Sequence, residues 1–203
     1  MGRPRQHDLN TLCDHAHDLW VTHGAAGVTI RALTAVSGAS SGAVYHAFGS
    51  RDGLLARVWA REAEDFLTFQ RGTVARAMAT GTPTDALVTA AMAPAHYAES
   101  NMDSARLLLS ANVDDLMTAE LTDDGRAQLR QRQKELGQLL VELSSALWNR
   151  QDPAAITTVR YCVVNLPGTL LLRSKNVTDP IAHHALELAV RGIASQAPPA
   201  SAV

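Results

Sequence analysis

Residues 29–48, TIRALTAVSGASSGAVYHAF, constrain the fold more than any other stretch, because they predict two short helices joined by a sharp turn. The hydroxyl of Thr29 can cap a first helix. Ser37-Gly38 then breaks the helical pattern, since glycine readily adopts the left-handed conformation that a tight helix exit needs. The inward positions of this first helix, at helical spacing, are predicted to be Ile30, Leu33 and Val36.

The second predicted helix has an apolar inner face and a lightly furnished outer face. Ser40 can cap it, and Val44 and Phe48 lie one turn apart and are expected to point inward. Small residues at its start let the backbone approach a surface, and its free N–H groups suit phosphate oxygens. Two helices of this kind have the shape that enters a DNA major groove, so the stretch favours a helix-turn-helix. The outer face consists of Ser41, Gly42, Tyr45 and His46.

Composition narrows the class of protein. The chain has 203 residues, of which 46% are hydrophobic, so it can bury a core as one or two domains. A net charge of −2 argues against a nonspecific nucleic-acid coat, although a local basic patch would still allow sequence-specific binding. The N-terminus has no apolar signal core and no apolar run could span a bilayer, so we expect a cytoplasmic protein.

The two cysteines, Cys13 and Cys162, stand far apart and predict neither a disulfide framework nor paired metal ligands. Cys13 and His17 share one face of a predicted first helix over residues 8–23, which could form half a zinc site. No second pair of ligands follows, so we expect no metal and assign Cys13 to the core. The apolar stripe of this helix is Leu9, Leu12, Cys13, Ala16, Leu19 and Trp20.

The rest of the chain predicts helices and no β alternation. Ser50 can cap a helix that runs from Arg51 to Met78 and ends before Gly81-Thr82-Pro83. Asp152-Pro153 and Asp179-Pro180 mark two later starts, with aspartate as the cap and proline in the first turn. Further helices are expected near 84–100, 103–117, 123–149, 153–173 and 180–196.

A known family shows the same order of residues over this region: Thr29 and Arg31, Gly38, Ser40-Ser41-Gly42, Val44-Tyr45-His46, Phe48, Ser50-Arg51-Asp52 and Leu54-Leu55. In this order the chain resembles the TetR family of transcriptional regulators, the tetracycline-repressor type. The resemblance covers roughly the first third of the chain. It implies an all-α fold with a three-helix DNA-binding domain at residues 1–50, including a basic arm at 1–7. Residues 51–203 would form a helical effector-binding and dimerisation domain.

The resemblance also implies DNA contacts. Arg31 would touch a base or a phosphate, Arg51 would hold a phosphate, and Thr29 would reach a phosphate in addition to capping its helix. Arg3 and Arg5 could lie in the minor groove, or belong to a solvated terminus. The remaining predicted contacts are Ser40, Ser41, Gly42, Ala43, Tyr45 and His46.

Three of these positions depart from the family's pattern. Ser41 stands where the family has Lys or Gln, and Gly42-Ala43 where it has Thr or Pro, so this helix offers few hydrogen bonds to bases. Ala43 could touch a thymine methyl group. Tyr45 could reach the phosphate backbone or a base edge with His46, or instead brace the first helix.

Two features of the C-terminal part suggest partners. The broad apolar faces near residues 157–172 and 181–193 could pair two subunits, or pack within one subunit. Pro167 should disturb its helix and free the carbonyl of Val163, as in a pocket wall. Each candidate for an effector pocket could equally be an ordinary core residue. The candidates are Met92, His96, Tyr97, Trp148, Tyr161, Asn165 and Thr169.

These observations predict a homodimeric repressor that binds a palindromic operator and is released by a moderately apolar small molecule of unknown identity. No cofactor and no enzyme signature is present in the sequence. Two alternatives stay open. One is a regulator of the same fold without a small ligand, and the other is an all-α enzyme or ligand-binding protein whose helix-turn-helix is only structural.

Overall fold

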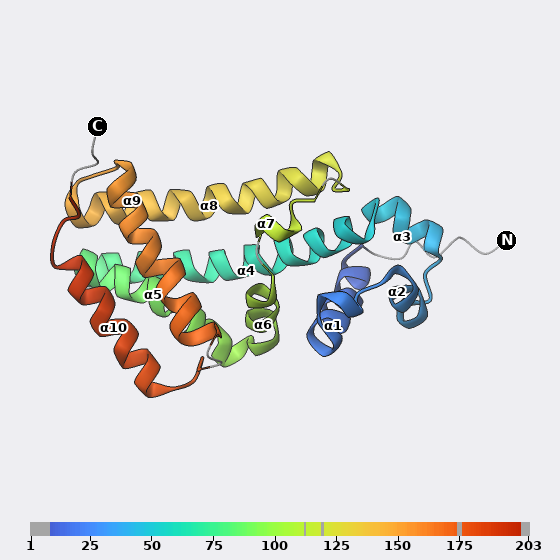
Figure 1. Cartoon of the computed structure of the whole chain (residues 1–203), viewed down its shortest axis with the longest axis horizontal. Coiled ribbons are helices and arrows are strands. Elements are labelled where there is room, and N and C mark those ends of the chain that lie inside the picture. The colour runs from blue at the N-terminus through green and yellow to red at the C-terminus, as the bar shows by residue number, and fades with distance from the viewer. Residues whose placement is uncertain (1–8, 112, 119, 174–175, 200–203) are drawn as a thin grey trace. The chain divides into compact units, whose positions relative to one another are not determined.

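The computed structural model describes residues 9–111, 113–118, 120–173 and 176–199. These residues form helices and no strand, which confirms the predicted all-α class (Figure 1). The helices are α1 (Leu9–Gly27), α2 (Ile30–Ser37), α3 (Ser41–Phe48), α4 (Arg51–Thr80), α5 (Pro83–Ser100), α6 (Met102–Ser110), α7 (Val113–Leu116), α8 (Asp123–Trp148), α9 (Pro153–Arg160), η1 (Tyr161–Asn165), η2 (Gly168–Arg173) and α10 (Pro180–Ala194).

Most helices begin where a capping side chain was predicted. Asp152 accepts bonds from N–H groups in the first turn of α9, and Asp179 does the same for α10. The start of α5 carries a full capping box, in which Thr82 and Asp85 satisfy each other's backbone N–H groups. Bonds from Thr82 and Arg191 lower the pKa of Asp85 to about 2.

Two predicted helices differ from those observed. The helix expected near 103–117 is divided into α6 and α7, and Asp114 and Asp115 in the first turn of α7 favour a new N-terminus there. The helix expected over 153–173 contains the π-helical segments η1 and η2 on either side of Pro167. Proline cannot donate to Val163, and the wider π turn accommodates the lost bond.

The described residues divide into two compact units. Unit 1 contains the residues up to Glu64 together with Arg106–Arg132, and unit 2 contains Asp65–Ala105 together with the residues from Gln133 onward. Helices α4, α6 and α8 therefore contribute residues to both units. The predicted boundary after residue 50 does not coincide with this division, because residues 51–64 and 106–132 pack with the N-terminal helices.

In unit 1, α1, α2 and α3 pack around an apolar core that includes Leu33 and the first half of α4 (Figure 1). Most of the predicted stripe of α1 is buried, but Leu9 is 48% exposed and Val36 of α2 is 50% exposed, so these two predictions were wrong. Leu9 lies at the very start of α1, before the core begins. The short α2 buries only its central position, which leaves Val36 in its last turn outside.

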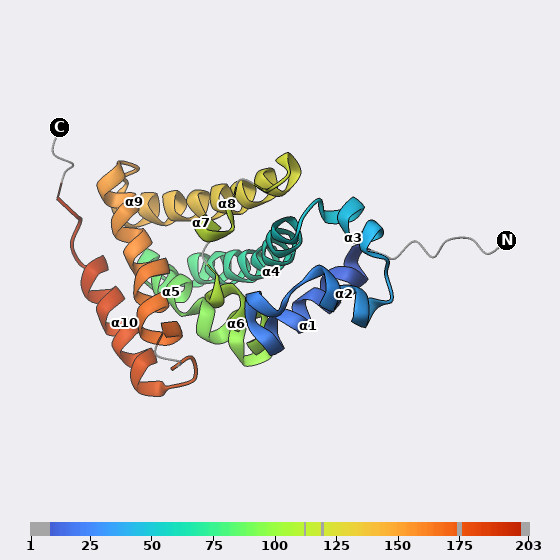
Figure 2. The ribbon, with the colours of Figure 1, turned by 45° about the vertical axis from the view of Figure 1, so that its right-hand side comes forward.

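In unit 2, α10 packs along α5 and next to η1 and η2, as both ribbon views show (Figure 2). Arg191 of α10 pairs with Asp85 of α5 at 3.0 Å. Tyr97 packs edge-on against Phe66 and in a tilted contact with Phe69, both with ring centroids 5.4 Å apart. In the part of the chain that the structure describes, no helix is long and apolar enough to cross a membrane.

The turn between α3 and α4 gives a direct test of this packing. Gly49 has φ 74°, and a Cβ atom there would lie 2.7 Å from Cγ2 of Thr122. We expect Gly49→Ala to lower the free energy of unfolding by about 1–3 kcal/mol, from backbone strain and from this clash. Thermal and chemical unfolding followed by circular dichroism would measure the change.

Two further variants separate the causes. Adding Thr122→Ser to Gly49→Ala should recover part of the loss, because serine keeps the hydroxyl that caps α8 but lacks Cγ2. Gly137→Ala, in open space on α8, should cost nothing. Equal stability of Gly49→Ala and the wild type would contradict the observed turn.

Candidate DNA-binding surface

Helix α3 has eight residues and is held by two caps and two buried side chains. The Ser40 hydroxyl accepts a bond from the N–H of Ala43 at 3.2 Å, and the N–H of Gly49 donates to the carbonyl of Tyr45 at 2.8 Å. Val44 is fully buried and Phe48 is 6% exposed. The predicted cap and inner face are thus confirmed, and they determine which side of α3 faces outward.

The outer face of α3 is open to solvent. Its first three residues, Ser41, Gly42 and Ala43, are exposed, and so is His46. Tyr45 is 53% exposed, which does not fit the alternative in which this ring braces α1. The backbone at the start of α3 is accessible because the side chains there are so small. This surface can therefore approach a groove closely.

The preceding helix presents two more of the predicted contacts. The hydroxyl of Thr29 accepts a bond from the N–H of Ala32 at 3.0 Å, which confirms its capping role. Thr29 and Arg31 are both exposed. Gly38 ends α2 with φ 70°, the left-handed conformation predicted from Ser37-Gly38. Exposed residues of α2 and α3, joined by this turn, form the candidate surface.

Arg51 has a different role from the predicted phosphate contact. Its Nε donates to the carbonyl of Val28 at 2.7 Å and its Nη2 donates to the carbonyl of Ala25 at 2.5 Å. The guanidinium thereby ties the start of α4 to the segment between α1 and α2. We therefore leave Arg51 out of the DNA contacts proposed below. Arg3 and Arg5, the predicted groove arm, lie outside the described residues.

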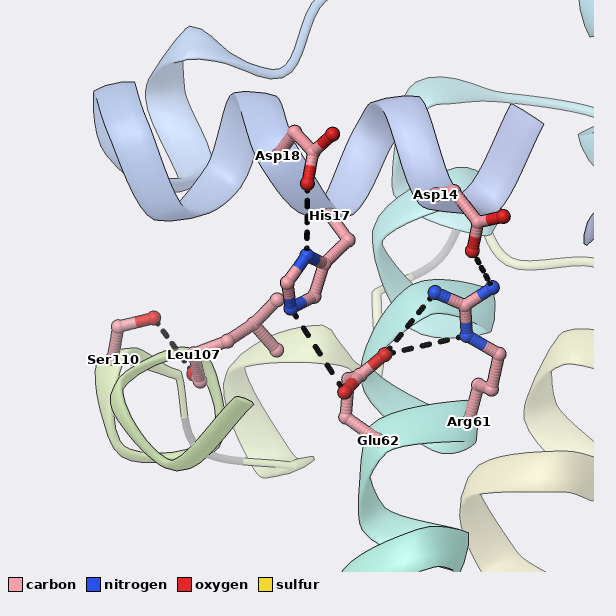
Figure 3. Close-up of polar contacts among 7 residues, drawn as sticks. All are labelled: Asp14, His17, Asp18, Arg61, Glu62, Leu107 and Ser110. Atoms are coloured by element: carbon pink, nitrogen blue, oxygen red, sulfur yellow. Dashed lines mark hydrogen bonds and ion pairs between the residues drawn. The ribbon is translucent and has the colours of Figure 1, made fainter. Parts of the chain in front are cut away.

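A polar cluster fixes α1 to α4 within unit 1 (Figure 3). Arg61 of α4 donates to Asp14 of α1 at 2.7 Å and to its neighbour Glu62 at 3.2 Å. The buried carboxylate of Glu62 also faces Nε2 of His17 at 3.9 Å. These contacts join α1, which carries the helix-turn-helix after it, to the long helix that continues into unit 2.

Cys13 lies in the core of unit 1, where desolvation raises the pKa of its thiol against the opposing effect of Arg61 and Arg57. A thiol that is harder to ionise is a poorer metal ligand. His17, its predicted partner, is directed toward Glu62 (Figure 3). Among the described residues, no group of three or more His, Cys, Asp or Glu side chains could hold a metal ion.

The seven predicted effector-pocket residues are not brought together. Met92 and Tyr97 are buried, and Trp148 is half-buried against the core of unit 2. The other four, His96, Tyr161, Asn165 and Thr169, are exposed. Exposure of these four arises because the helices bearing them turn other residues, such as Cys162 and Val163, into the core.

Unit 2 does contain a pocket of about 220 Å³, lined by none of those seven residues. It lies between the second half of α4 and the second half of α8. Its apolar lining could have been suspected from the helical spacing of Val74 with Met78 and of Leu139 with Leu143. The full lining is Arg71, Val74, Ala75, Met78, Leu139, Glu142 and Leu143.

Comparison with known proteins agrees with the geometry of unit 1. Residues 12–58 match the family model described as bacterial regulatory proteins, tetR family. This match spans α1, α2, α3 and the start of α4. The chain belongs to the TetR family of transcriptional regulators. The fold is thus that of DNA-binding regulators, and the all-α organisation implied by the resemblance is confirmed. No curated protein matches the chain.

Solved structures extend the likeness over the whole fold. A putative transcriptional regulator from Pseudomonas aeruginosa PAO1 is 19% identical with a TM-score of 0.67, covering 96% of this chain and 93% of that one. A tetR-family regulatory protein from Rhodococcus RHA1 is 18% identical with a TM-score of 0.66, covering 94% and 98%. The regulator FadR from Bacillus subtilis, in complex with stearoyl-CoA, is 11% identical with a TM-score of 0.64, covering 92% and 97%.

The different roles of Arg31 and Arg51 can be separated by salt dependence. We expect Arg31→Gln to weaken DNA binding and to reduce the slope of log affinity against log salt by about 0.9, if it contacts one phosphate. Arg51→Gln should leave this slope unchanged and instead lower the stability of the chain by about 1–3 kcal/mol, since two carbonyls lose a charged donor. Fluorescence anisotropy and thermal unfolding measure the two effects.

Arg76→Gln is the matched control, because it removes the same charge from an exposed position of α4 in unit 2. It should change neither property. A reduced salt slope together with wild-type stability in Arg51→Gln would return Arg51 to the set of phosphate contacts.

Proposed function

We propose that this TetR-family protein is a homodimeric repressor that binds a palindromic operator and is released from it by a small molecule. The observation that carries the proposal is the outer face of α3, where small side chains and the exposed Tyr45 surround an accessible helix N-terminus. Such a face can enter a major groove without steric hindrance. A protein of this kind would act in the cytoplasm.

The proposed DNA contacts divide by chemistry. Arg31 can bind guanine or phosphate, and Ala43 can touch a thymine methyl group. Ser41 and the free N–H groups at the start of α3 suit phosphate oxygens. Tyr45 and His46 would reach the backbone or a base edge at the far end of the helix. Thr29, Ser40 and Gly42 would lie close to the DNA, and Arg3 and Arg5 would act as a groove arm.

The proposed dimer rests on apolar side chains that unit 2 leaves exposed. On α10, Ile181 is 78% exposed and Leu188 is 57% exposed. Ala185 and Gly192, also exposed, lie on the same stripe at helical spacing. On η1, Tyr161 and Val164 are exposed as well. A two-fold axis between copies would cover these faces and would set two copies of α3 at half-sites one turn apart.

Release by a ligand requires that the ligand favour one arrangement of the dimer over another. Helix α4 is suited to transmit such a preference, because the same helix contributes Leu54, Leu55 and Val58 to the core of unit 1 and Val74 to the core of unit 2. The likeness to FadR, solved with stearoyl-CoA, supports the view that this fold accommodates a small effector.

Binding to the DNA upstream of the protein's own gene tests the function. We expect tight binding to one palindromic site, weakened roughly tenfold or more by Tyr45→Ala because a base or backbone contact is lost in each half-site. Tyr45→Phe distinguishes the ring from the hydroxyl. His23→Ala, an exposed α1 residue away from α3, is the control.

Two results would contradict the proposal. Equal and steeply salt-dependent binding to every fragment would show phosphate attraction without sequence recognition. Absence of binding at low salt, to these and to genome-wide fragments, would favour the alternative of an all-α ligand-binding protein. A regulator without a small ligand would bind its site but show no melting shift in a metabolite screen.

The dimer is tested by Leu188→Glu. We expect its dissociation constant to rise roughly a hundredfold or more, because the two-fold axis places the new charge twice in the apolar contact. Sedimentation equilibrium measures the change. Leu9→Glu makes the same substitution at a comparably exposed leucine in unit 1 and should leave the association unchanged. A dimer of undiminished stability in Leu188→Glu would place the interface elsewhere.

A further inference from the structure

The pocket between α4 and α8 in unit 2 combines an apolar interior with an ion pair. Val74, Leu139 and Leu143 are buried and form its inner wall, whereas Ala75 and Met78 are exposed at its mouth. The second halves of the two helices run side by side in both ribbon views (Figures 1 and 2). At about 220 Å³ it lies below the roughly 300–1,000 Å³ of sites for drug-sized ligands, so it suits a smaller molecule.

The two charges of the pocket are held very differently. Nη2 of Arg71 donates to the backbone carbonyl of Glu135 at 2.7 Å, which anchors the guanidinium to α8. Nη1 of Arg71 reaches the carboxylate oxygens of Glu142 at 3.3 and 3.4 Å. The Glu142 side chain is 59% exposed, against 33% for Arg71. The cation is therefore fixed, while its counter-ion is weakly held and can turn into solvent.

We propose that this pocket binds a small amphipathic monocarboxylate. The ligand's apolar body lies against Val74, Leu139 and Leu143, and its carboxylate takes the place of Glu142 on Arg71. A planar guanidinium matches a carboxylate in geometry, and an anchored one loses little freedom on binding. A ligand with two or more negative charges is disfavoured, because Glu135 and Glu142 both project from the same stretch of α8.

The consequence for DNA binding rests on the proposed function. A ligand here bridges α4 to α8 within unit 2, and α4 is the helix that continues into the core of unit 1. Binding at the pocket is a property of unit 2 side chains and can be measured without DNA.

The test uses sodium hexanoate as the probe, with 1-hexanol and hexylamine as its neutral and cationic counterparts, on the full chain by calorimetry at constant ionic strength. We expect hexanoate to bind more tightly than either counterpart. Arg71→Gln should weaken hexanoate binding roughly tenfold or more, because a charged hydrogen-bond donor is lost. Glu142→Gln should tighten it, because the competing carboxylate is removed.

Two variants complete the test. Ala75→Phe places a ring at the mouth from an exposed position, and it should abolish binding without disturbing the fold, as circular dichroism would verify. Arg76→Gln, an exposed arginine of α4 outside the pocket lining, should bind hexanoate as the wild type does.

Several outcomes would overturn the proposal. Equal binding of 1-hexanol would show that Arg71 takes no part, and preferential binding of hexylamine, lost in Glu142→Gln, would make this a cation site. Absence of hexanoate binding at millimolar concentration by the folded wild type would likewise overturn it. Hexanoate binding with the expected variant pattern, in a protein that ignores its upstream DNA, would uphold the pocket and reject the regulatory function.

Discussion

The structure of unit 1 depends on how a helix of eight residues is held in place. Isolated helices of this length are not stable in water, so α3 exists because Val44 and Phe48 are buried against the core and because Ser40 and Gly49 close its ends. The same two buried side chains determine the orientation of the helix. Ser41, Ala43 and the other small or polar residues are left outside, as a DNA-reading surface requires.

The corner after α3 is secured from two directions within unit 1. Arg51 bonds to the carbonyls of Ala25 and Val28, and the hydroxyl of Ser50 donates to the carbonyl of Glu120 at 3.2 Å. The missing side chain of Gly49 leaves room for Thr122. Residues far apart in the chain therefore meet at the exit of α3, which makes the orientation of this helix sensitive to the segment that precedes α8.

Unit 2 has two kinds of incompletely used surface, and they suit different partners. The stripe of α10 around Ile181 and Leu188 is apolar and convex, as expected of a face that pairs with a second copy. The pocket between α4 and α8 is concave, small, and bears a fixed cation with a replaceable counter-ion. A flat apolar face favours protein association, whereas a pocket with one anchored charge favours a small ion.

The sequence by itself determined the helices, their caps and the inner face of α3, because these depend on neighbours within one or two turns. It also indicated the family, through an ordered series of residues in one short region. Only the tertiary structure decided what depends on contacts between distant segments. Arg51 bonds to carbonyls that lie 23 and 26 residues earlier, Val36 and Leu9 fall outside the core, and the chain packs as units that divide α4. The pocket pairs Arg71 with Glu142, and helical periodicity cannot register two helices against each other across 71 residues of chain.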